Sequence, residues 1–215
     1  MPDDGAAAEA PRAAPDLPSG APTLEARVLD QLFRSARTQN KWSDDPVSDE
    51  QLQALYDLMR WGPTSANSFP LRIMFVKSPA AKERLKALVL AGNQPKVAAA
   101  PVTAILGYDT QFYELLPRLF PHTDARSWFV DKPDFAEASA FRNSSLQGAY
   151  FIIAARALGL DTGPMSGFDN EAVDREFFPG GRVKSNFLCA LGHGEPAGLF
   201  ERLPRPAFSE VCSIV

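Results

Sequence analysis

Three short apolar segments constrain the fold of this 215-residue chain more than any other feature. They cover residues 71–77, 102–108 and 185–193, and segments with helical periodicity separate them along the chain. Continuous apolar runs of this length are typical of strands that are covered on both faces of a sheet. The pattern therefore predicts an α+β or α/β fold in which helices flank one central sheet.

The segments around these strands repeat apolar residues every three or four positions, which indicates helices. The expected helices cover residues 24–33, 48–60, 80–90, 93–100, 135–160 and 170–178. Thr23 is the expected N-cap of the first helix, and Ser48 with Gln51 fits a capping box at the start of the second. Pro79 suits the first turn of the third helix, and Gly159 marks the C-terminal end of the longest one.

Three segments lack such patterns. Residues 111–134 combine prolines with aromatic side chains, which predicts an irregular excursion or lid. Residues 163–168 contain two glycines and a proline and are expected to form a constrained loop. Residues 1–22 are mostly Ala, Pro, Gly and Asp and are predicted to be a disordered tail, because they cannot bury enough apolar surface to offset the entropy of ordering. One domain is expected over residues 23–215.

Composition and charge exclude several classes of protein. The net charge of −4 gives no basic field for nucleic acid or for an anionic membrane. No apolar run reaches the roughly 18 residues of a transmembrane helix, and the N-terminus lacks the pattern of a secretory signal. Cys189 and Cys212 are isolated, so we expect a buried free thiol at Cys189 and no disulfide framework. The chain is expected in the cytoplasm.

Common catalytic motifs are missing from the sequence. Ser166 directly precedes Gly167, which does not match Gly-x-Ser-x-Gly, and no phosphate-binding glycine pattern follows a predicted strand. His122 and His193 stand apart, and no spacing suggests a metal site. We therefore expect either an enzyme that takes its chemistry from a cofactor or a protein that is not an enzyme.

Residues 61–70 form a polar, uncharged stretch between a predicted helix and a predicted strand. Pro63 and Pro70 restrict the backbone at the two ends of a run of hydroxyl and amide side chains, namely Thr64, Ser65, Asn67 and Ser68. A rigid loop of this kind suits the edge of a neutral heteroaromatic ring. The simpler interpretation is the end of a helix followed by a Ser/Asn turn.

Three further polar clusters remain. They are residues 37–41, the pair Asn93 and Lys96 on one helical face, and Arg205 between two prolines. Together with residues 61–70 they fit FMN, which has one phosphate and a ring with several acceptors. Each cluster taken alone also fits a solvated surface charge.

A set of motifs resembles the FMN-dependent nitroreductase family over about residues 24–215. In chain order the motifs are residues 36–42, 46–48 and 61–70, Asn93 with Lys96, and residues 158–168 and 191–194. Residues 124–129, 141–145 and 161–169 are similar to the subgroup of malonic semialdehyde reductases in pyrimidine degradation. The resemblance implies an α+β, nitroreductase-like fold with a mostly antiparallel sheet, and an entwined homodimer with two FMN sites at its interface.

The resemblance also assigns residues to the cofactor. The phosphate would be held by Arg37, Thr38 and Arg205, and the ring by Asn40, Asn93 and Lys96. The partner subunit would contribute Pro63, Thr64, Ser65 and Asn67. The loop from Pro164 and Met165 to Ser166 and Gly167 would face the ring, with a backbone N–H of Ser166 or Gly167 toward flavin N5. The chain departs from many members by having Ala36 in place of an arginine and Asn40 in place of a cation, and from some by Ser166 in place of an acidic residue.

The implied reaction is a ping-pong hydride transfer from NADH or NADPH through flavin N5, with no catalytic side chain and no metal. Malonic semialdehyde would be reduced to 3-hydroxypropanoate, with Arg126 or Arg142 binding its carboxylate and Trp128 as a wall; for both arginines a surface salt bridge is an equal alternative. A simple aldehyde needs its oxygen polarised, and the sequence offers no evident acid for this. A broad quinone or nitroaromatic reductase and a non-catalytic flavin-binding protein therefore stay open as alternatives.

Overall fold

The computed structural model describes residues 23–215. Its centre is a four-stranded sheet of β1 (Leu71–Val76), β2 (Val102–Asp109), β3 (Asp161–Met165) and β4 (Val183–Gly192). The strand order is β1-β2-β4-β3, and all neighbours are antiparallel. This sheet confirms the α+β prediction and excludes the α/β alternative. The disordered tail predicted for residues 1–22 lies outside the described residues.

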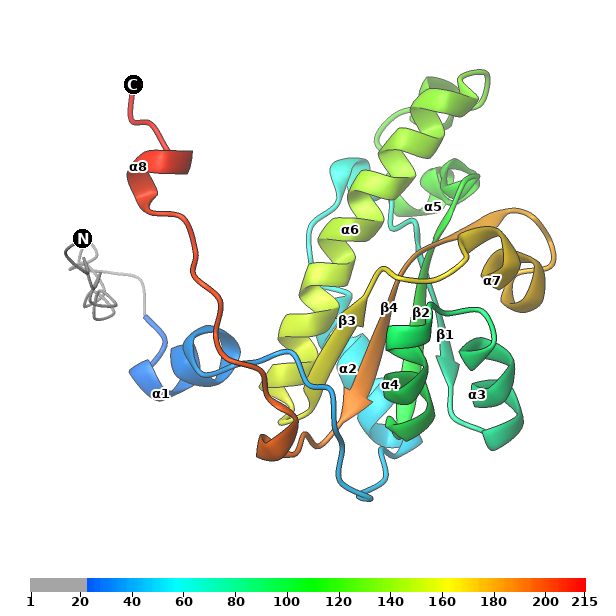
Figure 1. Cartoon of the computed structure of the whole chain (residues 1–215). Coiled ribbons are helices and arrows are strands. Elements are labelled where there is room, and N and C mark those ends of the chain that lie inside the picture. The colour runs from blue at the N-terminus through cyan, green and yellow to red at the C-terminus, as the bar shows by residue number, and fades with distance from the viewer. Residues whose placement is uncertain (1–22) are drawn as a thin grey trace, which may run out of the picture.

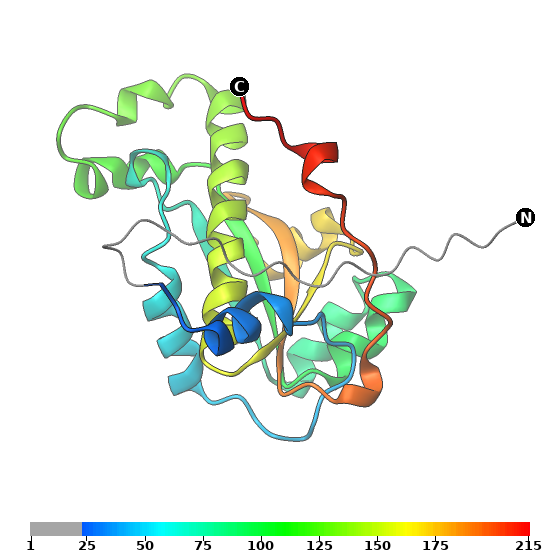
Figure 2. The same ribbon diagram turned by 90° about the vertical axis from the view of Figure 1, so that its left-hand side faces the viewer.

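Helices cover both faces of the sheet (Figures 1 and 2). α2 (Asp49–Met59) and α6 (Pro133–Ala157) lie on one face, and α3 (Pro79–Lys86), α4 (Gln94–Ala99) and α7 (Asn170–Phe177) lie on the other. Alternate residues of β2 divide between the two cores: Leu106 packs with α2 and α6, whereas Ile105 packs with α3, α4 and α7. β2 is buried along its whole length, as its apolar sequence predicts.

Short-range signals in the sequence place several helix ends correctly. The Ser48 hydroxyl accepts from the Gln51 N–H at 3.2 Å, and the Gln51 side chain accepts from the Ser48 N–H at 2.8 Å, so the capping box at α2 is confirmed. Pro79 is the first residue of α3. Gly159 follows α6 with φ of +78°, the left-handed conformation that ends helices.

The helix predicted over residues 135–160 runs from Pro133 to Ala157, and two other predicted helix boundaries are wrong. Glu25, not Thr23, precedes the first helix, α1 (Ala26–Leu29), and the chain then continues as a π-helical turn over Asp30–Arg34. α3 ends at Lys86 instead of continuing to residue 90, because the following residues pair with the chain after β3. The Leu90 N–H donates to the Gly167 carbonyl at 3.0 Å, and the Asp169 N–H donates to the Leu88 carbonyl at 2.9 Å.

The loop predicted over residues 163–168 is also wrong in its first part, because Asp161–Met165 forms β3. Pro164 has no N–H for a sheet ladder and so argues against a central strand. β3 lies at the edge of the sheet, with β4 as its one partner strand in the described chain and an isolated bridge at Thr162 on its other side, so a proline is tolerated at position 164. The position of β3 at the sheet edge therefore overrides the turn that the glycines and the proline of this segment predict.

The middle of α6 consists of small residues because the sheet approaches it closely. A Cβ added to Gly148 would lie 2.6 Å from the Phe187 ring of β4. Cys189, also on β4, is a buried free thiol as predicted, and burial raises its pKa to about 12. Within residues 23–215, no helix is both long and apolar enough to cross a membrane.

Two segments extend from this body. Residues 110–132 contain only the short helix α5 (Leu116–Leu119) and 3₁₀ turns, which confirms the predicted irregular excursion, and they enclose a small core around Phe112 and Phe129. Residues 201–215 form a C-terminal arm with the short helix α8 (Phe208–Val211). Figure 1 shows this arm standing away from the sheet and helices, and all of its residues are exposed.

Candidate functional site

One group of predicted site residues gathers along the outer edge of β3. Thr38 forms a parallel bridge with Thr162, and the Gln39 N–H donates to the Thr162 carbonyl at 3.0 Å. The Arg37 guanidinium donates to the Phe200 carbonyl, and the Asn40 amide donates to the Gly198 carbonyl at 3.3 Å. Residues 37–40 are therefore fixed between β3 and the chain that follows β4.

α4 and its N-terminal turn bring a second group to the end of the same strand. Asn93 Nδ2 donates to the Gly167 carbonyl at 3.0 Å, and a Cβ on Gly167 would lie 2.7 Å from that nitrogen. Lys96 follows on α4, partly buried and without an ion pair among residues 23–215. Within residues 23–215, the N–H groups of Ser166 and Gly167 have no hydrogen-bond acceptor. Two cations, two amides and two free backbone donors thus lie along one strand edge and just beyond it.

The polar stretch of residues 61–70 lies elsewhere. It joins α2 to β1 and contains a 3₁₀ turn at Ser65–Asn67, packed against α6 and α5. Figures 1 and 2 both place this loop at the opposite end of the molecule from residues 37–42. Within one chain, Pro63, Thr64, Ser65 and Asn67 are therefore not brought together with residues 37–42. The loop packs on the α2 and α6 side of the sheet, whereas Asn93 precedes α4 on the other side.

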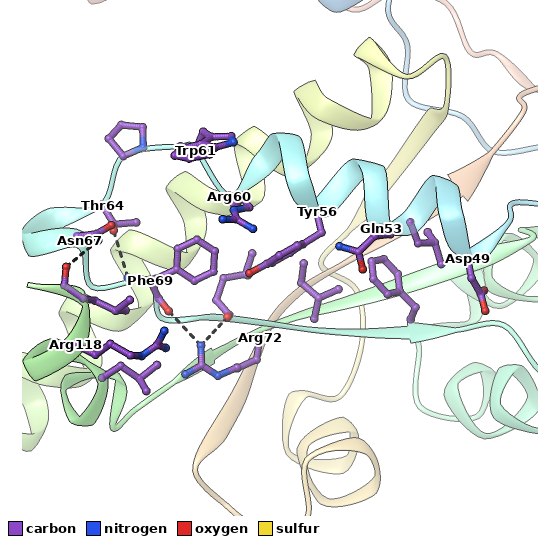
Figure 3. A pocket seen from close by; sticks show the side chains of 18 of the residues that line it. Asp49, Gln53, Tyr56, Arg60, Trp61, Thr64, Asn67, Phe69, Arg72 and Arg118 are labelled. Carbon is purple, nitrogen blue, oxygen red and sulfur yellow. Dashed lines mark hydrogen bonds between the residues drawn. The ribbon is translucent and has the colours of Figure 1, made fainter.

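The same loop borders a cavity of about 1290 Å³ between α2 and β1 (Figure 3). Its lining includes Thr64 and Asn67 from the loop, with Tyr56 and Trp61 on the α2 side. The Trp61 side chain is 77% exposed, and the Arg60 guanidinium lies 5.3 Å from its ring centroid. The exposed indole of Trp61 therefore lies at the rim of this cavity.

The three residues proposed for substrate differ in their availability. The Arg126 guanidinium donates twice to the Glu114 carboxylate, at 2.9 and 2.7 Å, and this pairing lowers the pKa of Glu114. Arg142 lies on the exposed side of α6 and pairs with no carboxylate in the part of the chain that the structure describes. Trp128 is exposed and packs against Phe120.

Arg205 is not brought to the β3 edge. It lies on the C-terminal arm, where its guanidinium donates to the neighbouring Leu203 and Pro204 carbonyls. Arg202 lies closer: it donates to the Arg34 carbonyl at 2.8 Å and to the Ala36 carbonyl at 3.4 Å, beside Arg37. Arg202 was not predicted from the sequence, because no local pattern distinguishes it from Arg205, the other cation of the arm.

Three residues of α6 were also missed. Asn143, Gln147 and Tyr150 follow one another at intervals of four and three, so they share one helical face, and each contacts residues 62–71. That spacing of two amides and a phenol was visible in the sequence, although it did not show which segment they contact.

Comparisons with known proteins agree with this architecture. The model of the nitroreductase family matches residues 33–193. A protein of Polynucleobacter asymbioticus, provisionally named NADH dehydrogenase/NAD(P)H nitroreductase, is 59% identical over 195 residues, which cover 91% of this chain and 100% of the relative. A protein of Burkholderia lata with the same provisional name is 60% identical over 192 residues, which cover 89% of this chain and 98% of the relative.

Solved structures share the fold at lower identity. A Bacillus subtilis protein provisionally assigned as a nitroreductase superposes with a TM-score of 0.78 at 22% identity, covering 89% of this chain and 100% of its own. An Exiguobacterium sibiricum protein with a similar provisional assignment, solved in complex with FMN, gives a TM-score of 0.75 at 17% identity. That match covers 86% of this chain and 96% of the other.

Proposed function

The chain belongs to the nitroreductase family, and from this premise we propose that it is an FMN-dependent NAD(P)H oxidoreductase. The observation that carries the proposal is the gathering of Arg37, Thr38, Asn93, Lys96 and the free N–H groups of Ser166 and Gly167 along β3 and its end. The names of the relatives indicate NAD(P)H as the reductant, and the FMN complex of one structural neighbour indicates FMN as the cofactor.

The donors at the β3 edge fit FMN. The Arg37 guanidinium and the Thr38 hydroxyl suit a phosphate, and Arg202 adds a further cation beside them. The backbone N–H groups of Ser166 and Gly167 suit ring acceptors, and Asn93 offers a further amide donor. Arg205, as it lies on the arm, reaches this edge only if the arm moves or belongs to another subunit. Pro164 and Met165 end β3 just before these donors and would hold the chain beside the ring; Met165 is buried.

When bound, FMN accepts a hydride from NAD(P)H and passes it to a second substrate. The residues of the chain would bind the cofactor, orient its ring and stabilise the charge that develops on it. Lys96 would hold a positive charge near the part of the ring where negative charge develops, and this electrostatic effect would need no proton transfer. Asn40, which stands where many members carry a cation, offers only an amide, so ring stabilisation rests more heavily on Lys96.

We propose further that the protein is a homodimer, because one chain separates the two halves of the site. The loop that carries Pro63, Thr64, Ser65 and Asn67 lies at the far end of the molecule from residues 37–42 (Figure 2). A second copy can supply it. Two apolar surfaces support this assembly: the exposed side of α6 with Phe141 and Leu146, and the C-terminal arm, whose Phe208, Val211 and Ile214 are exposed.

For the second substrate we propose malonic semialdehyde, on the resemblance of residues 124–129 and 141–145 to that subgroup. Arg142 is the cation that can meet its carboxylate, because Arg126 is already paired with Glu114. Reduction of quinones or nitroaromatics is the second candidate, which the names of the relatives favour and which needs no acid to polarise an oxygen. The demand for NAD(P)H fits action in the cytoplasm.

A spectroscopic titration tests these proposals. The purified protein should show the visible absorption of bound flavin, which NADH or NADPH should bleach without oxygen. Malonic semialdehyde should then restore the colour. Restoration by a quinone alone would replace the aldehyde with the second candidate. Flavin that resists bleaching would indicate a flavin-binding protein without turnover, and a colourless protein that takes up no FMN would refute the proposed function.

A further inference from the structure

The loop between α2 and β1 holds an unusual backbone. Ala66, Asn67 and Phe69 have φ of 50°, 49° and 45°. Residues with a Cβ rarely adopt this left-handed region, and three of them fall within four positions. Such a conformation persists only where surrounding contacts over-determine it, and it is typical of ligand-binding segments.

One face of α6 supplies such contacts to the loop and its two ends. The ring of Tyr150 packs so closely on Gly62 that a Cβ there would lie 2.6 Å from the ring. Gln147 Oε1 accepts the Leu71 N–H at 3.0 Å, where β1 begins. Between these ends, Asn143 Oδ1 accepts the Ser65 N–H at 2.8 Å.

Of these three side chains, Asn143 alone acts on the start of the strained turn. It is 2% exposed, and its Nδ2 donates to the Ser139 carbonyl at 2.9 Å, which fixes the direction in which Oδ1 points. Ser65 is the first residue of the 3₁₀ turn, and the Ser68 N–H donates back to its carbonyl at 3.1 Å. Fixing Ser65 therefore fixes the turn that carries Asn67.

Two other contacts hold the far side of the turn. Asn67 Nδ2 donates to the Leu119 carbonyl at 2.9 Å, and Arg72 Nη1 donates to the Phe69 carbonyl at 3.1 Å (Figure 3). Asp109 in turn orients Arg72, by a contact of 2.6 Å. With Asn143 on one side and Arg72 on the other, the turn is shaped by the protein before any ligand arrives.

We propose that Asn143 is a positioning residue for the flavin site, which sets the shape of the turn that presents Thr64, Ser65 and Asn67 to the cofactor held by the partner subunit. The inference rests on the proposed function. Asn143 itself lies behind the turn, buried under it, and does not need to touch the cofactor. Its effect passes through the Ser65 N–H.

The test compares three variants by FMN dissociation constant and by thermal unfolding of the apoprotein. Asn143→Leu keeps the volume and removes the acceptor, and it should weaken FMN binding about tenfold. Asn143→Asp keeps an acceptor for Ser65 but replaces the donor to the Ser139 carbonyl with an oxygen, so it should recover only part of that loss. Gln147→Leu removes the neighbouring acceptor, which serves β1, and should lower the melting temperature with less than about a twofold change in FMN affinity.

Flavin affinity unchanged in Asn143→Leu, or lost equally in Gln147→Leu, would overturn the inference while leaving the proposed function intact. Wild-type protein that takes up no FMN would overturn the proposed function itself, so the two failures are distinct. If Asn143→Leu does not fold, Asn143→Ala takes its place, and the shape of the bound flavin's visible spectrum provides a second readout. A change of that spectrum in Asn143→Ala but not in Gln147→Leu would support the inference.

Discussion

Asn93 and Gly167 lie 74 positions apart and are joined by a hydrogen bond of 3.0 Å from the Asn93 amide to the Gly167 carbonyl. The contact leaves no space for a side chain on Gly167, because a Cβ would lie 2.7 Å from Asn93 Nδ2 and 3.1 Å from Leu90. Among residues 23–215 no acceptor engages the Gly167 N–H, so this donor stays free for a ligand. One glycine thus joins α4 to the chain after β3 and keeps a donor for the cofactor.

Gly167→Ala should therefore weaken FMN binding. The added methyl group must displace Asn93 or the backbone, which moves both amide donors, and a loss of about tenfold in affinity is expected. Gly92→Ala is a matched control on the same turn, because nothing lies within 4 Å of the position that its Cβ would take. Equilibrium dialysis of both variants against FMN measures the difference. Equal affinities would show that the Gly167 position is not part of the site.

Asn67 can be tested for its side chain and its backbone separately. Asn67→Ala removes the amide that donates to Leu119 and places alanine at φ of 49°, at a backbone cost of about 1 kcal/mol. Asn67→Gly removes the same amide without that cost. Both variants should retain less FMN while remaining folded by circular dichroism. Loss in the alanine variant alone would assign the effect to the backbone, and unchanged flavin content in both would return the loop to an ordinary Ser/Asn turn.

Mixed dimers test whether the site is shared between subunits. Arg37→Ala and Asn67→Ala each damage a different half of the proposed site. If Arg37 of one subunit works with Asn67 of the other, a dimer of one variant with the other contains one intact site and one doubly damaged site. Co-refolded variants should then recover up to about half of the wild-type flavin content in the mixed dimers. If both halves came from one chain, mixing would restore nothing.

Stability toward acid should depend on the contact between Glu137 and Lys184. Lys184 Nζ lies 2.6 Å from the Glu137 carboxylate and holds its pKa below the ordinary 4.5. The folded protein therefore binds this proton less readily than the unfolded chain, so the contribution to stability is present above the ordinary pKa and is lost as pH falls through the lowered value. Glu137→Gln should flatten the pH dependence of the melting temperature below about pH 5. Lys184→Met should flatten it likewise, and an unchanged slope in both would exclude this pair as the cause.

Substrate recognition should respond to Arg142 more than to Arg126. Arg142→Gln should raise the KM for malonic semialdehyde about tenfold and leave the KM for a quinone unchanged, since only the first substrate has a carboxylate. Arg126→Gln should mainly unpair Glu114 in the excursion and lower its local stability. Steady-state kinetics with both oxidants distinguish the two variants. A larger effect of Arg126→Gln on the aldehyde KM would reverse the assignment.

Some features were fixed by residues that lie close together in the chain. The capping box of Ser48 and Gln51, the start of α3 at Pro79 and the end of α6 at Gly159 depend on contacts within a turn of helix. The apolar run of β2 likewise predicted a strand buried on both faces, and in β4 the same prediction holds for its second half, residues 188–192. The order of the polar motifs along the chain also indicated the nitroreductase family, which the comparison with known proteins then confirmed.

Tertiary structure decided what depends on distant partners. Pro164 predicted a turn from the sequence, but β3 lies at the edge of the sheet, where the missing N–H removes no needed hydrogen bond between strands. From the sequence, Arg126 looks like a free cation, and only the fold brings Glu114 beside it. Arg202 and Arg205 also look alike in the sequence, and only the fold shows that Arg202 contacts residues 34–36. Asn143 gains its role only because packing of α6 brings it to Ser65, 78 positions away. A sequence states which groups can donate and accept, whereas which donor meets which acceptor is settled by the packing of whole surfaces.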